Sequence, residues 1–126
     1  MLDAIGIVSG SIEKSSAFYK VFDLYFKQSG GPDHFEAVSE KGLRIMLDTV
    51  ELIKKINPSW KKHPNQNMVL CFKQSSSQDV DQKYQACLEQ HGKSIKEPWD
   101  AFWGQRYASV QDPDGNQIDI FADLTD

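Results

Sequence analysis

The sequence reads DGNQIDI at residues 114–120 and KGLRIML at residues 41–47, and these two stretches decide the fold. Each stretch places a glycine in a turn and then alternates polar and apolar side chains, which is the two-residue period of a half-buried β-strand. In each half of the chain the same elements precede this strand, namely one strand, one helix and two further strands. Two copies of one βαβββ unit are the economical explanation.

The repeat predicts an α+β fold in which two βαβββ units form a curved, cleft-bearing mixed sheet with helices on its outer face. One domain, residues 1–126, holds a first unit at 2–49, a linker at 50–66 and a second unit at 67–122. The sequence does not decide whether the linker forms a helix or a mobile lid. The predicted helices start at residue 12, behind the N-cap residue Ser11, and at residue 79. The predicted strands cover residues 2–8, 24–28, 35–38, 43–48, 68–72, 94–95, 105–111 and 116–122.

The composition excludes several classes of partner. Fourteen basic residues against eighteen acidic ones give a net charge of −4, so we expect no nucleic-acid partner. No apolar stretch approaches the roughly 20 residues that span a bilayer, and the first residues lack a basic segment, so we expect a cytoplasmic protein without a membrane partner. Cys71 and Cys87 lie in apolar segments, which predicts buried, reduced thiols. The three histidines are interpreted as surface residues.

Alternation along the strands predicts which side chains line the cleft. Ile118, Ile120 and Ala122 point toward the helices, while Gln117, Asp119 and Phe121 point the other way. The corresponding strand of the first unit turns Arg44, Met46 and Asp48 toward the cleft. The charged members of this set have two interpretations: a strand face that is solvated or tied in ion pairs, or contacts with a ligand.

Three of the bulky aromatic residues gather in one segment, which the sequence predicts to be a loop. Trp99, Phe102 and Trp103 lie there, and Trp60 lies in the linker. One interpretation is that these rings seal the core or a dimer interface. The other is that they wall a pocket, because small-molecule sites are mostly apolar and aromatic, and indole rings suit flat or cationic ligands.

Three motifs together resemble a known family: SAFYK at residues 16–20, WGQRY at 103–107 and DPDGN at 112–116. With the repeated unit, they resemble the vicinal oxygen chelate superfamily, which contains glyoxalases, bleomycin resistance proteins and extradiol dioxygenases. The resemblance extends over nearly the whole chain and implies the fold. It does not imply one function, because many functions share this fold.

The resemblance implies a divalent metal held by His or Glu side chains on the first and last strands of each unit. Carried across, these positions fall near Ala4, at Met46, at Met68 or Val69, and at Asp119. Only the Asp119 carboxylate is a good ligand for a hard divalent ion, and Asp48 would need a change of register to join it. We therefore expect no metal and no other cofactor, and the sequence disfavours glyoxalase I and dioxygenase chemistry.

The first functional hypothesis is a metal-free, homodimeric binding protein that sequesters an aromatic or cationic small molecule in the sheet cleft without catalytic residues. One alternative is a divergent glyoxalase-like lyase or isomerase, which either uses a metal at Asp48 and Asp119 or uses Asp119 as a general base. Another alternative is a subunit whose cleft is filled by its own or a partner's side chains. The predicted ligand-binding residues are Arg44, Met46, Asp48, Trp60, Trp99, Phe102, Trp103, Tyr107, Asp119 and Phe121.

Overall fold

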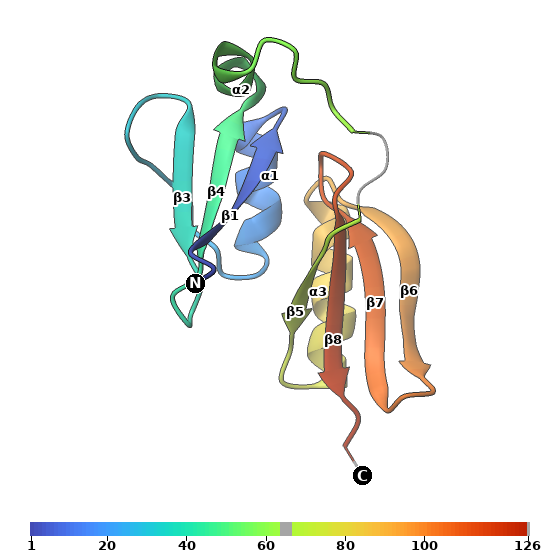
Figure 1. The fold of residues 1–126 in the computed structure, drawn as a ribbon. Coiled ribbons are helices and arrows are strands. Elements are labelled where there is room, and N and C mark those ends of the chain that lie inside the picture. Colours follow the sequence, from blue (N-terminus) through green and yellow to red (C-terminus); the bar gives the residue numbers. More distant parts are fainter. Residues whose placement is uncertain (64–66, 126) are drawn as a thin grey trace. The chain divides into compact units, whose positions relative to one another are not determined.

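The computed structural model describes residues 1–63 and 67–125. The chain divides into two compact units, Met1–Pro64 and Asn65–Asp126, and each contains a four-stranded mixed sheet (Figure 1). The predicted α+β class with two βαβββ units is confirmed. Within the described residues, no helix is long and apolar enough to cross a membrane.

The first unit follows the predicted order of elements, with one additional helix at its end. Its sheet has the strand order β1-β4-β3-β2, in which β1 runs parallel to β4 and the other neighbours are antiparallel. Figure 1 shows α1 behind β1 and β4. The elements are β1 (Ala4–Ser9), α1 (Ile12–Lys20), β2 (Lys27–Gln28), β3 (His34–Val38), β4 (Arg44–Thr49) and α2 (Val50–Ile56).

Helix α1 begins where the sequence predicts and supplies the core of the first unit. The Ser11 side chain accepts a hydrogen bond from the backbone N–H of Lys14, which satisfies one of the free donors of the first turn. Phe18 and Tyr19 are fully buried, and their rings meet edge to face with centroids 5.0 Å apart. Ile45 and Leu47 of β4 are also buried, and they supply the sheet side of this core.

Helix α2 forms the first part of residues 50–66, for which the sequence did not decide between a helix and a mobile lid. Thr49 caps it by accepting a hydrogen bond from the backbone N–H of Leu52, and the helix ends at Ile56. Asn57 and Pro58 follow it, and Pro58 cannot donate a backbone hydrogen bond to continue a helix. The predicted linker therefore begins with two turns of helix.

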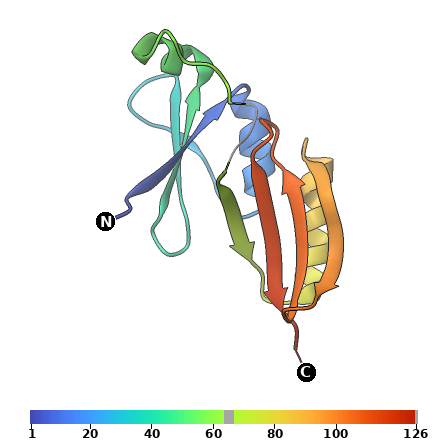
Figure 2. The same cartoon turned by 45° about the vertical axis from the view of Figure 1, so that its right-hand side comes forward.

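The second unit has the strand order β5-β8-β7-β6, with β5 parallel to β8. Figure 2 shows α3 against one face of this sheet. The elements are β5 (Val69–Lys73), α3 (Ser77–Glu89), β6 (Lys93–Ala101), β7 (Gln105–Gln111) and β8 (Gln117–Asp123). The fully buried side chains on the helix and the sheet are Val80, Cys87, Ala108, Val110, Ile118, Ile120 and Ala122.

The DPDGN turn between β7 and β8 is held by one buried carboxylate. Asp112 accepts hydrogen bonds from the backbone N–H groups of Asp114 and Asn116 and from the Asn116 side-chain amide, at 2.8 to 2.9 Å. Gly115 has a φ of +90°, a conformation that side chains other than glycine's disfavour. The predicted tight turn is confirmed, and it fixes the register of β8 against β7.

Three local predictions need correction. Strand β2 is limited to Lys27–Gln28, although the sequence predicted a strand from residue 24, and Leu24 is instead buried in the core. Strand β6 is longer than predicted and includes Trp99, which the sequence placed in a loop. Cys71 is exposed, while Cys87 is buried as predicted. Cys71 lies on the sheet face that α3 does not cover, because it pairs with Asp119, whereas the neighbouring Ile118 and Ile120 face the core.

Candidate functional site

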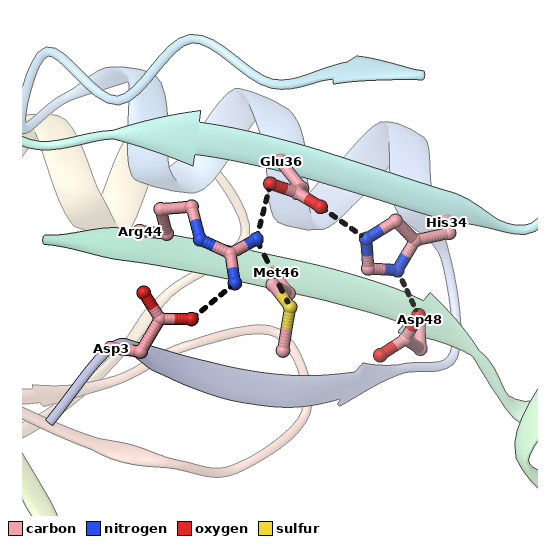
Figure 3. A network of polar contacts seen from close by, with 6 residues as sticks. All are labelled: Asp3, His34, Glu36, Arg44, Met46 and Asp48. Carbon is pink, nitrogen blue, oxygen red and sulfur yellow. Dashed lines mark hydrogen bonds and ion pairs between the residues drawn. The ribbon is translucent and has the colours of Figure 1, made fainter. Parts of the chain in front are cut away.

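A network of charged side chains lies on one face of the first sheet (Figure 3). His34 and Glu36 are two residues apart on β3, so their side chains share a face. The β3–β4 register sets Asp48 opposite His34 and Met46 opposite Glu36. Figure 3 shows the His34 ring between the two carboxylates.

The imidazole of His34 is engaged at both ring nitrogens. Its Nε2 lies 2.7 Å from Oε2 of Glu36, and its Nδ1 lies 2.5 Å from Oδ1 of Asp48. The hydrogen bond to Asp48, followed by the one to Glu36, raises the pKa of His34 above its ordinary value of 6.5. Hydrogen bonds from His34 and from Arg44 lower the pKa of Glu36. The geometry therefore favours an imidazolium held between two carboxylates.

Arg44 completes the network. Its guanidinium donates to Oε1 of Glu36 at 2.7 Å and to Oδ2 of Asp3 at 2.6 Å, and these contacts raise its pKa. One guanidinium nitrogen also lies 3.9 Å from the sulfur of Met46. Of the two interpretations of Arg44 and Asp48, the structure shows the ion-paired one, and the prediction that they bind a ligand stays a prediction.

The interpretation of all three histidines as surface residues is wrong for His34. His63 and His91 are exposed, whereas only 23% of the His34 side chain is exposed. The neighbouring turn residues concealed its place at the start of β3. The available signal was the alternation of His34 and Glu36 along a strand that pairs with the one carrying Asp48.

The stability of the protein should depend on pH through His34. The raised pKa of folded His34 means that its contribution is complete below pH 6.5 and is lost as pH rises through the folded-state value. We expect His34→Gln to lower the free energy of unfolding at pH 6 by about 1 kcal/mol more than at pH 9, as measured by urea denaturation. The exposed His91→Gln variant is the control, and an equal cost of His34→Gln at both pH values would contradict the prediction.

A second polar group lies around Asp119 of β8, on the face of the second sheet opposite the one that Ile118 and Ile120 share with α3. The carboxylate is 8% exposed and accepts three hydrogen bonds. Tyr107 Oη donates to Oδ2 at 2.7 Å, while Ser109 Oγ and Gln117 Nε2 donate to Oδ1 at 2.8 and 3.1 Å. Ser109 pairs with Asp119 in the β7–β8 register, which directs both side chains to the same face.

The groups next to Asp119 stay protonated at neutral pH. Burial, followed by the hydrogen bond to Asp119, raises the pKa of Tyr107. Partial desolvation, followed by the negative charge of Asp119, also raises the pKa of Cys71. Because the thiolate is the reactive form of cysteine, Cys71 is not an activated nucleophile in this structure. The arrangement provides a fixed carboxylate with a phenol oriented on it.

A continuous series of rings adjoins this carboxylate. The Trp99 and Trp103 rings meet edge to face at 5.6 Å between centroids, Trp103 meets Tyr107 at 5.3 Å, and Tyr107 stacks on Phe121 at 5.9 Å. Trp103 is 48% exposed. We call Trp99, Trp103, Tyr107 and Phe121 the aromatic row; it combines exposed aromatic surface with the negative charge of Asp119.

The structure distributes the ten predicted ligand-binding residues over the two units. Trp60 lies after α2, where its backbone N–H donates to the Asn57 carbonyl. Phe102 packs against Trp103 at 5.0 Å between centroids and is 91% exposed. The residues that lie together in the first unit are Arg44, Met46 and Asp48, and those in the second unit are Trp99, Phe102, Trp103, Tyr107, Asp119 and Phe121.

Ser109 and Gln117 fix Asp119 but are not among the predicted ligand-binding residues: Gln117 was predicted only to line the cleft, and Ser109 was missed. Their signal was periodic, because Tyr107 and Ser109 are two residues apart on one strand and Gln117 and Asp119 are two residues apart on the next. Glu36 and Asp3 were missed in the same way in the first unit. Both are polar: Glu36 lies opposite the predicted site residue Met46 on the paired strand, and Asp3 directly precedes β1.

The side chains at the expected metal positions do not fit a divalent cation. Ala4 has no donor atom, and Met46 offers a thioether, a soft ligand. Met68 and Val69 are exposed apolar residues, and both oxygens of Asp119 already accept hydrogen bonds. Across residues 1–63 and 67–125, no group of three or more His, Cys, Asp or Glu side chains is arranged to hold a metal ion.

Solved structures of low sequence identity share this fold. A glyoxalase-related enzyme from Fulvimarina pelagi has a TM-score of 0.84 at 17% identity, with 98% of this chain and 88% of that chain covered. A glyoxalase/bleomycin resistance protein/dioxygenase family enzyme from Burkholderia phytofirmans PsJN has a TM-score of 0.79 at 22% identity, with 98% of both chains covered. A hypothetical protein from S. aureus has a TM-score of 0.83 at 15% identity, with 97% of this chain and 92% of that chain covered. No curated protein matches the chain.

The match at the level of sequence families is more specific than these likenesses of fold. A model described as the Glyoxalase/Bleomycin resistance protein/Dioxygenase superfamily matches residues 1–120. This range includes both βαβββ units almost completely, and it contains all three motifs on which the resemblance was based. The chain belongs to the glyoxalase/bleomycin resistance protein/dioxygenase superfamily.

Proposed function

We propose that this protein binds a flat aromatic or cationic small molecule, without a metal, on the face of the second sheet that carries the aromatic row. The observation that carries the proposal is the exposed Trp103, which joins a row of rings ending beside the fixed carboxylate of Asp119. Binding sites for small molecules combine apolar and aromatic surface with a few placed polar groups, and this face has both.

Trp103 and Asp119 have different roles in the proposed binding. The indole of Trp103 supplies a polarisable surface on which a flat ring stacks, and it attracts cations through its π electrons. Asp119 supplies a negative charge whose position is fixed by donors from β7 and β8. A ligand that is both aromatic and positively charged would use both features, so we expect it to bind more tightly than a neutral analogue.

The same geometry supports binding more than proton transfer by Asp119. Both carboxylate oxygens accept hydrogen bonds from side chains of β7, and a general base would have to exchange one of these bonds for a substrate proton. Homodimer formation also stays a prediction, which light scattering of the purified protein would test.

The proposal predicts that Trp103→Ala abolishes ligand-induced stabilisation. In a thermal-shift screen of aromatic and cationic compounds, the wild-type melting temperature should rise with the logarithm of ligand concentration. The variant should lose this response because the exposed stacking surface is gone, while its unliganded melting temperature stays within a few degrees of the wild type.

The control is Tyr25→Ala, which removes a 57% exposed aromatic side chain from the first unit. It should keep the full ligand response. Failure of every compound class to stabilise the wild type would overturn the proposed function, as would an unchanged response in Trp103→Ala.

A further inference from the structure

Lys96 already places a cation on the aromatic row. Its Nζ lies 4.7 Å from the centroid of the Trp99 ring, within the range of a cation–π interaction. We propose that Lys96 is an internal competitor, which occupies the place on Trp99 where the cationic group of a bound ligand would lie. This inference rests on the proposed function and narrows the ligand to an organic cation.

An irregularity in β6 brings the two side chains to one face. Residues three apart on a regular strand point to opposite faces of the sheet. Lys96 pairs with Ser109, and Trp99 pairs with Tyr107, so β6 has one residue more than β7 over the same length. This bulge turns Lys96 toward the face that carries Tyr107, Ser109 and Asp119, as bulges beside functional sites commonly do.

The Trp99 ring also lacks one of the contacts that a tryptophan placed only for packing would make. Its Nε1–H is buried and has no hydrogen-bond partner within the described residues. Buried indole N–H groups usually have a partner, and leaving one without a partner costs stability. We therefore interpret Trp99 as a ring held for recognition, with its π face taken by Lys96 in the absence of a ligand.

Lys96 is suited to being displaced. The residue is exposed, and no ion pair joins it to a carboxylate in the parts of the chain that the structure describes. A cationic ligand must displace the Lys96 ammonium before it reaches the Trp99 ring. A neutral aromatic ligand gains less binding free energy at the same position. Removal of the lysine charge should therefore increase affinity for cations specifically.

The test compares Lys96→Gln with the wild type by calorimetry, with benzyltrimethylammonium as the cationic probe and benzyl alcohol as the neutral one. We expect Kd for benzyltrimethylammonium to fall about twofold to fivefold in the variant, since exposed cation–π contacts have that magnitude. The Kd for benzyl alcohol should change less than about twofold. Lys93→Gln is the matched control, because it removes the same charge from an exposed position on the same strand.

Each other outcome has one meaning. An equal gain in affinity for the cation in Lys93→Gln would show a general effect of charge. An equal gain in affinity for benzyl alcohol in Lys96→Gln would show that the substitution only uncovers the ring. Either result would overturn the proposed role of Lys96 as a competitor. If the wild type binds the cation and Lys96→Gln binds it no more tightly, the proposed role of Lys96 is overturned and the proposed function stays intact. Absence of binding of both probes to the wild type and to both variants would count against both.

Discussion

Replacing Asp119 with alanine should lower the free energy of unfolding by about 2 to 3 kcal/mol and abolish the preference for cationic ligands. The substitution removes one acceptor from three donors at once. Ser109 is buried and Tyr107 is half-buried, so their hydroxyls would lose a partner where water has limited access. Urea denaturation measures the first effect, and paired titrations with benzyltrimethylammonium and benzyl alcohol measure the second.

Two further variants make this result specific. Asp119→Asn keeps one carbonyl oxygen and the side-chain size, so it should retain part of the stability but lose the preference for the cation. Asp123→Ala removes an exposed carboxylate from the same strand, whose contacts are with Gln105 and Lys73, and its unfolding midpoint should stay near that of the wild type. A stable Asp119→Ala protein with unchanged ligand preference would show that the carboxylate has no part in either property.

Replacing Phe18 with alanine should have the largest effect on stability, a loss of about 3 to 5 kcal/mol. The ring is fully buried in the core of the first unit, against Tyr19 and near Phe22, so its removal leaves a cavity in addition to the lost burial. Because domains of this size are stable by only about 5 to 15 kcal/mol, this loss removes a large share of the total stability.

Circular dichroism during urea titration of the full chain measures this loss. Phe22→Ala is the matched control, because Phe22 follows α1 and is half-buried, so its truncation should cost clearly less. Equal midpoints for the two variants would mean that the buried face of α1 is not the main source of stability in the first unit.

The fold was predictable because its signals are local. The glycine turns and the alternation after them depend on residues a few positions apart, and the bonds of Asp112 to Asp114 and Asn116 show the turn chemistry that the DPDGN motif indicates. The buried Ile118 and Ile120, with Asp119 between them directed to the other face, follow from alternation alone.

The candidate site was predictable only in part, because its contacts depend on the register between strands. His34 and Asp48 are fourteen residues apart, and their pairing follows from a strand register that the sequence does not reveal. The sequence also placed Trp99 in a loop, whereas the structure includes it in β6, where an extra residue puts Lys96 and Trp99 on one face. Cys71 was misjudged because its apolar neighbours do not indicate that its face of the sheet is uncovered.

The irregular strand β6 has a consequence for solubility. It is the last strand in the order β5-β8-β7-β6, and an outermost strand offers backbone groups to which another chain can add. A bulge, a proline and exposed lysines are the devices by which natural sheets resist such self-association, and β6 has all three. Neutralising a lysine of β6 weakens this protection. The Lys96→Gln variant, which is expected to bind cations more tightly, would therefore also be more prone to aggregate.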